Sequence, residues 1–165
     1  EYLNGIQLSS FFENIELYKI YSIWEKIASI IINEKKYDKN AYFIIYNKII
    51  ELDKKLSNID NIILKNAFNI LKCFNWDYCI KCSCHWDMTL ENIIICDNDL
   101  YLIDFLDSFY DTWLIDMSKI FQDIECKWSY RNKKEIKQNL IIRLSILKYF
   151  LIEKILKIDD WNNIL

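Results

Sequence analysis

Glycine and proline are almost missing from this sequence, which has one glycine and no proline among its 165 residues. The glycine-rich loops that let a backbone wrap closely around nucleotide phosphates are therefore excluded. The same sequence is rich in Ile, Asn and Lys. We attribute this combination to AT-rich coding rather than to a structural requirement.

An excess of positive charge is also missing. The formal net charge is -3 and the isoelectric point is near 5.3. A general nucleic-acid-binding protein normally presents a basic face, so we expect no nucleic-acid partner. Three lysines do gather at Lys133, Lys134 and Lys137, but Glu135 interrupts them. This group indicates a solvated helix face.

Long uncharged apolar runs are absent, and none reaches the roughly 18 residues that a membrane-spanning helix needs. Residues 1–5 do not combine a basic segment with an apolar core, as a secretory signal would. The six cysteines are therefore expected to be free thiols in a reducing cytoplasm. With 53% hydrophobic residues, the chain can bury one substantial core, so we expect a single domain over 1–165.

The first half of the chain has the apolar periodicity of helices. Ser10 and Glu13 fit a capping box, and apolar residues then recur at helical spacing, which predicts a helix over 10–33. A second helix is predicted from Asp38 or Asn40 to about 56, and a third over 60–73. The residues expected to face the core are Phe11, Ile15, Tyr18, Tyr21, Trp24 and Ala28 in the first helix, Ile44, Ile45, Ile49 and Leu52 in the second, and Ile63, Ala67, Ile70 and Leu71 in the third.

Short β-rich runs follow. We expect a strand over 78–83 and a hairpin of two strands, 92–96 and 100–105, joined by a turn at 97–99. The expected fold is thus mainly α, with a small β-hairpin set into a helical body. The helical pattern returns over 111–124 and 133–157, and the last helix places one apolar side toward the core: Ile136, Leu140, Leu144, Leu147 and Leu151.

The only histidine begins the motif that carries the chemistry. His85, Asp87 and Asn92 have the H-x-D-x-x-x-x-N spacing of a phosphoryl-transfer loop, and Asp104 follows near the end of the second hairpin strand. Phosphoryl transfer needs a carboxylate that orients the attacking hydroxyl, and Mg²⁺ needs hard oxygen ligands. Because a hairpin brings its two ends together, Asn92 and Asp104 are expected to be neighbours.

These motifs resemble those of the aminoglycoside phosphotransferase and choline kinase family, which has a protein-kinase-like fold. The family loop usually reads H-G-D-x-x-x-x-N, followed by I-D and then by D-x-x-x-D-L-A. The matching residues of this chain are His85-Trp86-Asp87 with Asn92, then Ile103-Asp104, and then Asp111-Thr112-Trp113-Leu114-Ile115-Asp116-Met117-Ser118.

The resemblance implies a role for each matching residue. Asp87 would be the catalytic base, and Asn92 and Asp104 would bind Mg²⁺, with ATP or another nucleoside triphosphate as phosphate donor. His85 would support the loop from a buried position, and Asp116 would tie the following helix to it. The chain departs from the family at Trp86, where the family has glycine, and we expect Trp not to adopt a backbone conformation reserved for glycine.

The resemblance covers nearly all of this chain but only about the second half of such enzymes. It implies that residues 1–5 form the hinge between two lobes, with Glu1, Tyr2 and Leu3 binding the nucleotide. The N-terminal lobe that covers the phosphates would then be missing. We therefore expect the chain to be the C-terminal lobe of a kinase-like fold and to be inactive on its own.

The substrate expected from the resemblance is a small-molecule alcohol, such as choline or another amino alcohol, a sugar or an aminoglycoside. Asp107 and Asp111 could attract an aminosugar, and Trp128 is a further candidate contact. A subset of the aromatic residues could instead surround a quaternary ammonium group, although packing in the core or at its rim is favoured for each Trp. These residues are Trp76, Trp113, Trp128 and Tyr130.

A zinc site is one alternative. Cys79, Cys82, Cys84 and His85 could supply its ligands, and Cys126 could join them. Structural zinc sites, however, usually pair two well-separated C-x-x-C units. On a strand over 78–83, moreover, Cys82 and Cys84 would point one way and Cys79 the other.

A non-enzymatic helical module with a degenerate kinase-like loop is the second alternative. Trp86 favours this interpretation, because it replaces the glycine of the family motif. The joint presence of Asp87, Asn92 and Asp104 opposes it.

Overall fold

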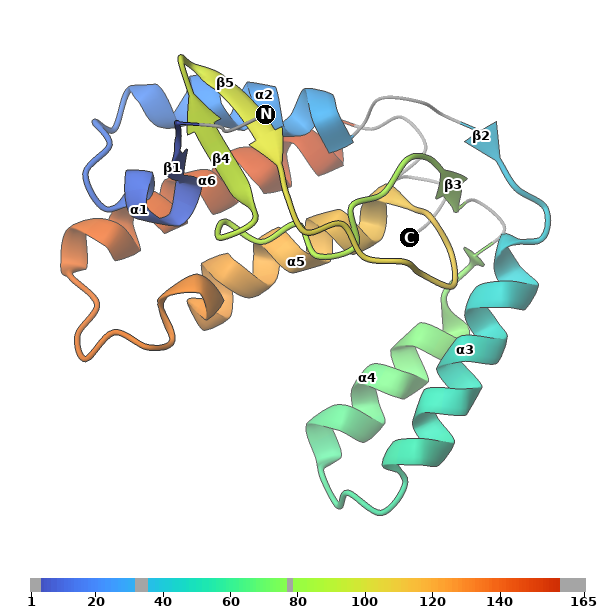
Figure 1. The fold of residues 1–165 in the computed structure, drawn as a ribbon. Coiled ribbons are helices and arrows are strands. Elements are labelled where there is room, and N and C mark those ends of the chain that lie inside the picture. Colours follow the sequence, from blue (N-terminus) through green and yellow to red (C-terminus); the bar gives the residue numbers. More distant parts are fainter. Residues whose placement is uncertain (1–3, 32–35, 77–78, 158–165) are drawn as a thin grey trace.

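A small antiparallel sheet lies against a layer of helices in this computed structural model (Figure 1). The structure describes residues 4–31, 36–76 and 79–157. The sheet has the strand order β1-β4-β5, with bounds Ile6–Gln7, Ile93–Cys96 and Asp99–Leu102. The expected mainly α fold with a small hairpin is confirmed, and β1 adds a strand that the sequence pattern did not indicate.

The hairpin of β4 and β5 turns over two residues. These are Asp97 and Asn98, and both have positive φ, at 49° and 69°. Positive φ at both central residues is typical of a type I′ turn, whose twist suits the adjoining strands and which Asp and Asn tolerate. The expected hairpin is confirmed, but its turn is one residue shorter than 97–99, because Asp99 already pairs with Cys96.

The main core lies between the sheet and four helices: α1 (Leu8–Phe12), α2 (Lys19–Ile31), α5 (Trp113–Cys126) and α6 (Gln138–Leu156). α6 starts later than expected, because 131–137 form turns and irregular chain after the short 3₁₀-helix η2 (Trp128–Tyr130). Within the described ranges no helix, α6 included, is long and apolar enough to cross a membrane. The leucines of α6 expected to face the core are buried: Leu140, Leu144, Leu147 and Leu151.

The single helix expected over 10–33 is wrong, because a turn separates α1 from α2. Ser10 lies inside α1, whose N-cap is Gln7 and has no side-chain cap bond, so Ser10 and Glu13 do not form the expected capping box. Arg143 of α6 donates to the backbone oxygens of Glu13 (2.9 Å) and Ile15 (2.7 Å) and so satisfies carbonyls at the break. The break shifts the inward face: Tyr18 and Tyr21 are exposed, and the buried residues of α2 are Ile20, Ile23, Trp24, Ile27, Ala28 and Ile31.

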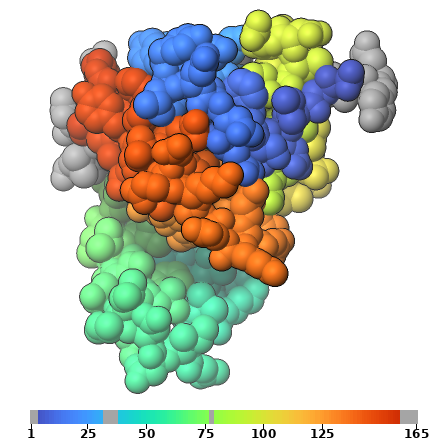
Figure 2. Space-filling view, turned by 90° about the vertical axis from the view of Figure 1, so that its left-hand side faces the viewer, coloured from blue at the N-terminus to red at the C-terminus, as the bar shows by residue number. Residues whose placement is uncertain are grey.

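α3 (Ala41–Leu56) and α4 (Ile62–Cys73) form a helical hairpin that projects from the rest of the molecule (Figures 1 and 2). Both helices were expected, within two residues at each end. Asn61 caps α4 by accepting the amides of Ile63 and Leu64. A second, smaller core cluster lies at this hairpin, and Leu114 of α5 packs against both clusters. Its buried residues are Ala41, Ile45, Ile49, Phe68, Trp76, Cys79 and Tyr110.

The expected inward face of α4 is wrong. Ile63 and Ile70 are 76% and 69% exposed, and Ala67 is exposed as well. Phe68 is buried instead, and Leu64 packs against the same cluster. α4 packs on one neighbouring helix, so only one stripe of its apolar surface is covered, and the large Phe68 ring occupies that stripe.

The chain enters the candidate site along β3 (Ile80–Lys81). This strand is shorter than the one expected over 78–83, and Tyr78 lies outside the described residues. β3 pairs with β2 (Lys36–Tyr37). The amide of Cys82 donates to the backbone oxygen of Asp111 (3.3 Å). The segment before the His85 motif is therefore held beside the start of α5.

Candidate functional site

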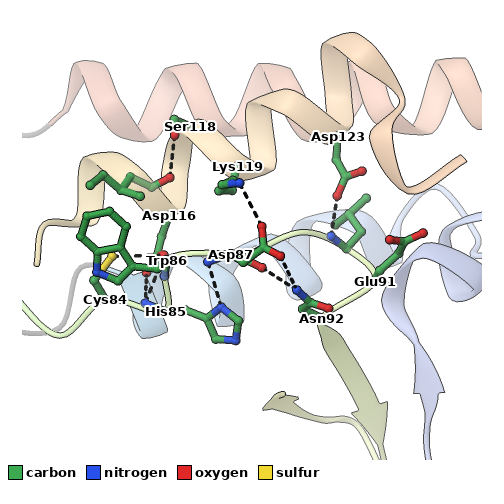
Figure 3. A network of polar contacts seen from close by, with 12 residues as sticks. Cys84, His85, Trp86, Asp87, Glu91, Asn92, Asp116, Ser118, Lys119 and Asp123 are labelled. Carbon is green, nitrogen blue, oxygen red and sulfur yellow. Dashed lines mark hydrogen bonds and ion pairs between the residues drawn. The ribbon is translucent and has the colours of Figure 1, made fainter. Parts of the chain in front are cut away.

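The carboxylate of Asp87 is held by two residues, one of α5 and one that directly precedes β4 (Figure 3). Asn92, which directly precedes β4, donates through Nδ2 to the backbone oxygen of Asp87 (2.8 Å) and to its Oδ2 (3.0 Å). Lys119 of α5 places Nζ 3.0 Å from Asp87 Oδ1. The Asp87 side chain remains 30% exposed, so a ligand in solvent can still reach the carboxylate.

The expected hairpin juxtaposition of Asn92 and Asp104 follows from the strand register. The backbone oxygen of Asn92 accepts the amide of Ile103 (3.0 Å), so Asp104 is the next residue beyond this contact. Asp104 has a φ of 58° and is exposed. Among the described residues it has no side-chain hydrogen-bond or ion-pair partner, which leaves both carboxylate oxygens open.

His85 joins the loop to the return strand of the hairpin. Its ring Nδ1 accepts the amide of Asp87 (3.3 Å), because an amide N–H can only donate. The ring proton is therefore on Nε2, which lies 2.6 Å from the backbone oxygen of Ile103 and donates to it. His85 is 1% exposed, and its ring lies against that of Phe105, with a centroid separation of 4.3 Å.

Asp116 joins the same loop to the first turn of α5. Its buried carboxylate accepts the amide of His85 at 2.9 and 3.1 Å and the amide of Trp86 at 2.8 Å (Figure 3). The Cys84 thiol lies 3.3 Å from the same carboxylate. Burial, together with the negative charge of Asp116, raises the pKa of Cys84 to about 12, so this cysteine remains a neutral thiol.

Trp86 does adopt a left-handed backbone conformation, contrary to expectation, with a φ of 72°. For a residue with a Cβ this conformation costs on the order of 1–2 kcal/mol. The Asp116 carboxylate holds the Trp86 amide, and the indole Nε1 donates to Asp111 Oδ1 (3.0 Å). The indole also contacts Phe109 edge-on, at a centroid distance of 5.2 Å. These contacts offset the backbone strain.

Two residues that hold the loop were missed from the sequence, Lys119 and Asp123. Asp123 is fully buried and accepts the amides of Leu90 and Ser129, each at 2.5 Å. Its burial raises its pKa. Asp116, Lys119 and Asp123 follow an i, i+3, i+7 spacing, so they share one face of α5. This spacing of charged residues on an otherwise apolar face was the available signal.

The three expected substrate contacts do not come together. Asp107 and Asp111 are both exposed in the segment before α5, and Asp111 accepts the indole N–H of Trp86. Trp128 follows the other end of α5. A helix of that length spans roughly 20 Å, so α5 separates Trp128 from the two aspartates. It is exposed and packs under the guanidinium of Arg131 (4.7 Å), which forms an ion pair with Glu91 (3.0 Å).

The other aromatic candidates belong to the core. Trp113 and Tyr130 are buried in the main cluster, and Trp76 is buried in the smaller cluster. Tyr130 donates its hydroxyl to the backbone oxygen of Ser9 (2.9 Å). These three residues therefore form no aromatic box with the exposed Trp128.

All four side chains of the zinc alternative contact other polar groups of the protein. Cys79 contacts the Thr112 hydroxyl at 3.4 Å, whereas Cys84 contacts Asp116 and the Thr112 carbonyl. Cys82 places its sulfur 4.0 Å from the backbone oxygen of Ile31, and burial raises the pKa of its thiol to about 11. In the part of the chain that the structure describes, no three His, Cys, Asp or Glu side chains form a group able to hold a metal ion.

The residues assigned to the nucleotide hinge, Glu1, Tyr2 and Leu3, lie outside the described residues. Comparisons of the chain with models of protein families, with curated proteins and with solved structures found no match.

Proposed function

We propose that this chain carries the catalytic residues of a phosphotransferase that moves the γ-phosphate of ATP to the hydroxyl of a small molecule. The observation that carries the proposal is the fixed carboxylate of Asp87, whose two oxygens contact Asn92 and Lys119. A carboxylate held in this way can align an attacking hydroxyl and accept its proton. Positioning of this kind supplies much of the catalysis in phosphoryl transfer.

The remaining donor set suits Mg²⁺. Because Asn92 uses its amide nitrogen on two acceptors of Asp87, its amide oxygen faces away from them and stays available to a cation. Asp104 adds an exposed carboxylate without a partner among the described residues. In the proposal these two residues bind the Mg²⁺ that accompanies ATP, since this ion prefers oxygen ligands. The bound ion neutralises charge on the transferred phosphate.

His85, Asp116 and Asp123 support the loop in this proposal, and they do not contact the substrate. Together they accept or donate hydrogen bonds along 85–90 and hold Asp87 at a defined position. The resemblance to aminoglycoside phosphotransferases and choline kinases supports a C-terminal kinase-like lobe. We further propose that a second lobe covers the phosphates.

The test is product formation by the full protein that contains these residues. The protein is incubated with Mg·ATP and, in turn, choline, ethanolamine, a hexose and an aminoglycoside, and phosphorylated products are sought by mass spectrometry. The proposal expects one class of alcohol to gain a phosphate with stoichiometric release of ADP. It is wrong if no alcohol is phosphorylated, or if the same activity persists in Asp87→Asn.

A further inference from the structure

Lys119 is the one cation that the structure places on the carboxylate of Asp87, among the residues it describes. We propose that Lys119 is a positioning residue, which sets the orientation of the Asp87 carboxylate relative to the acceptor hydroxyl. The inference rests on the proposed phosphotransferase function and adds a residue from α5 to that site. The sequence motif itself contains no such lysine, because the residues between Asp87 and Asn92 are Met, Thr, Leu and Glu.

The geometry gives the two oxygens of Asp87 different partners. Lys119 approaches Oδ1 and Asn92 donates to Oδ2, both at 3.0 Å. With only Asn92 in place, the carboxylate could rotate about its χ2 bond, which has a broad energy profile. With both donors in place, its plane is defined. Each carboxylate oxygen has two lone pairs, so one on each oxygen remains for an incoming hydroxyl.

The position of Lys119 is itself fixed by its helix. Asp116 lies one turn earlier and holds the amides of His85 and Trp86, and Asp123 lies one turn later and holds the amide of Leu90. The loop is thus tied to α5 on both sides of Lys119. The backbones of Lys119 and Asp87 are consequently held at a fixed distance from each other.

Stability does not explain this pair. The side chains of Lys119 and Asp87 are 34% and 30% exposed, and ion pairs with such access to water contribute little to the stability of the fold. A variant that removes the ammonium should therefore fold, and its effect on turnover can be measured separately.

The experiment compares variants of the full protein by steady-state kinetics. Lys119→Met keeps the apolar stem and removes the charge, and Lys119→Arg restores a cation. Lys148→Met is the matched control, since Lys148 forms an exposed ion pair with Glu125 on α5 (2.5 Å), at the opposite end of that helix from Asp116. The fourth and fifth proteins are Asp87→Asn and the double variant Asp87→Asn/Lys119→Met.

We expect Lys119→Met to lower kcat by about 10- to 100-fold, the range for a catalytic group displaced by around 1 Å. The KM values for ATP and for the alcohol should stay within about 3-fold, because Lys119 acts on the carboxylate and not on binding. Lys119→Arg should recover most of the loss, and Lys148→Met should behave as wild type. The double variant should be no slower than Asp87→Asn, because Lys119 acts through Asp87.

Three results overturn this inference without touching the proposed function. An unchanged kcat in Lys119→Met, with an active wild type, removes the positioning role and leaves the proposed function standing. An additive loss in the double variant shows that Lys119 acts independently of Asp87. An equal loss in Lys148→Met shows a general effect of charge. An inactive wild type, by contrast, overturns the proposed function, and the inference with it.

Discussion

The indole nitrogen of Trp86 donates a hydrogen bond to Asp111, 3.0 Å away, while the backbone of Trp86 stands at a φ of 72°. The side chain thus stabilises a loop conformation that its own Cβ disfavours. The two effects oppose each other at one residue, and substitutions can separate them.

Replacement of Trp86 by Gly and by Ala gives the first prediction. Both variants lose the indole contacts, but only Ala retains a Cβ in the left-handed conformation. We expect the Gly variant to be more stable than the Ala variant by about 1 kcal/mol, the reverse of the usual order. Urea unfolding at pH 7 measures the difference. Equal stability, or a more stable Ala variant, would show that the backbone at this position is not strained.

The second prediction concerns Asp123, because burial raises the pKa of its carboxyl group. A carboxyl with a raised pKa in the folded protein favours the folded state most when it is protonated. Its contribution is therefore fully present below the unfolded pKa and is lost as pH rises through the folded pKa. As the pH rises through this range, we expect the unfolding free energy of the wild type to fall relative to that of Asp123→Asn. Urea unfolding at a series of pH values tests the sign, and a difference that moves the other way contradicts it.

The third prediction separates the roles of Asp87 and Asp104. Asp87→Asn should lower kcat by about 10²–10⁴-fold, the usual contribution of a general base, with little change in Mg·ATP affinity. Asp104→Asn should weaken Mg·ATP binding as well as turnover, because the proposal gives it a metal ligand's role. Isothermal titration of each variant of the full protein with Mg·ATP measures the affinity. If both variants bind Mg·ATP like wild type, Asp104 is not a ligand.

The fourth prediction tests the orientation of α4. Phe68 is 7% exposed, and its replacement by Ala should cost about 3–5 kcal/mol of unfolding free energy. Ile63 is 76% exposed, and Ile63→Ser should change stability by no more than about 0.5 kcal/mol. Denaturant unfolding monitored by circular dichroism compares the two. A large loss in Ile63→Ser would show that another surface covers this face.

The parts that the sequence predicted correctly depend on local information. The hairpin turns at Asp97 and Asn98, two residues that tolerate positive φ. The resulting register places Asn92 opposite Ile103. The helix expected over 111–124 from its apolar periodicity is α5, which lies two residues later. Such signals lie within a few residues of the structure they determine.

The parts that failed depend on contacts distant in sequence. The break after α1 is held by Arg143, which lies 128 residues beyond Ile15, and nothing near Ile15 indicates it. On α4, apolar residues cover more of the helix than one neighbour can bury, so periodicity alone could not choose between Ile63 and Phe68. Lys119 and Asp123 became visible as part of the site only when the face of α5 was known.

The attachment of 85–90 to α5 has a consequence for the dynamics of this loop. Asp116 and Asp123 are buried residues of a helix that belongs to the main core, and they receive the amides of His85, Trp86 and Leu90. These amides can exchange their hydrogens with solvent only when the loop separates from α5. Although the segment is irregular, these three amides should therefore be protected from exchange, and their protection reports the free energy with which the loop is held on α5.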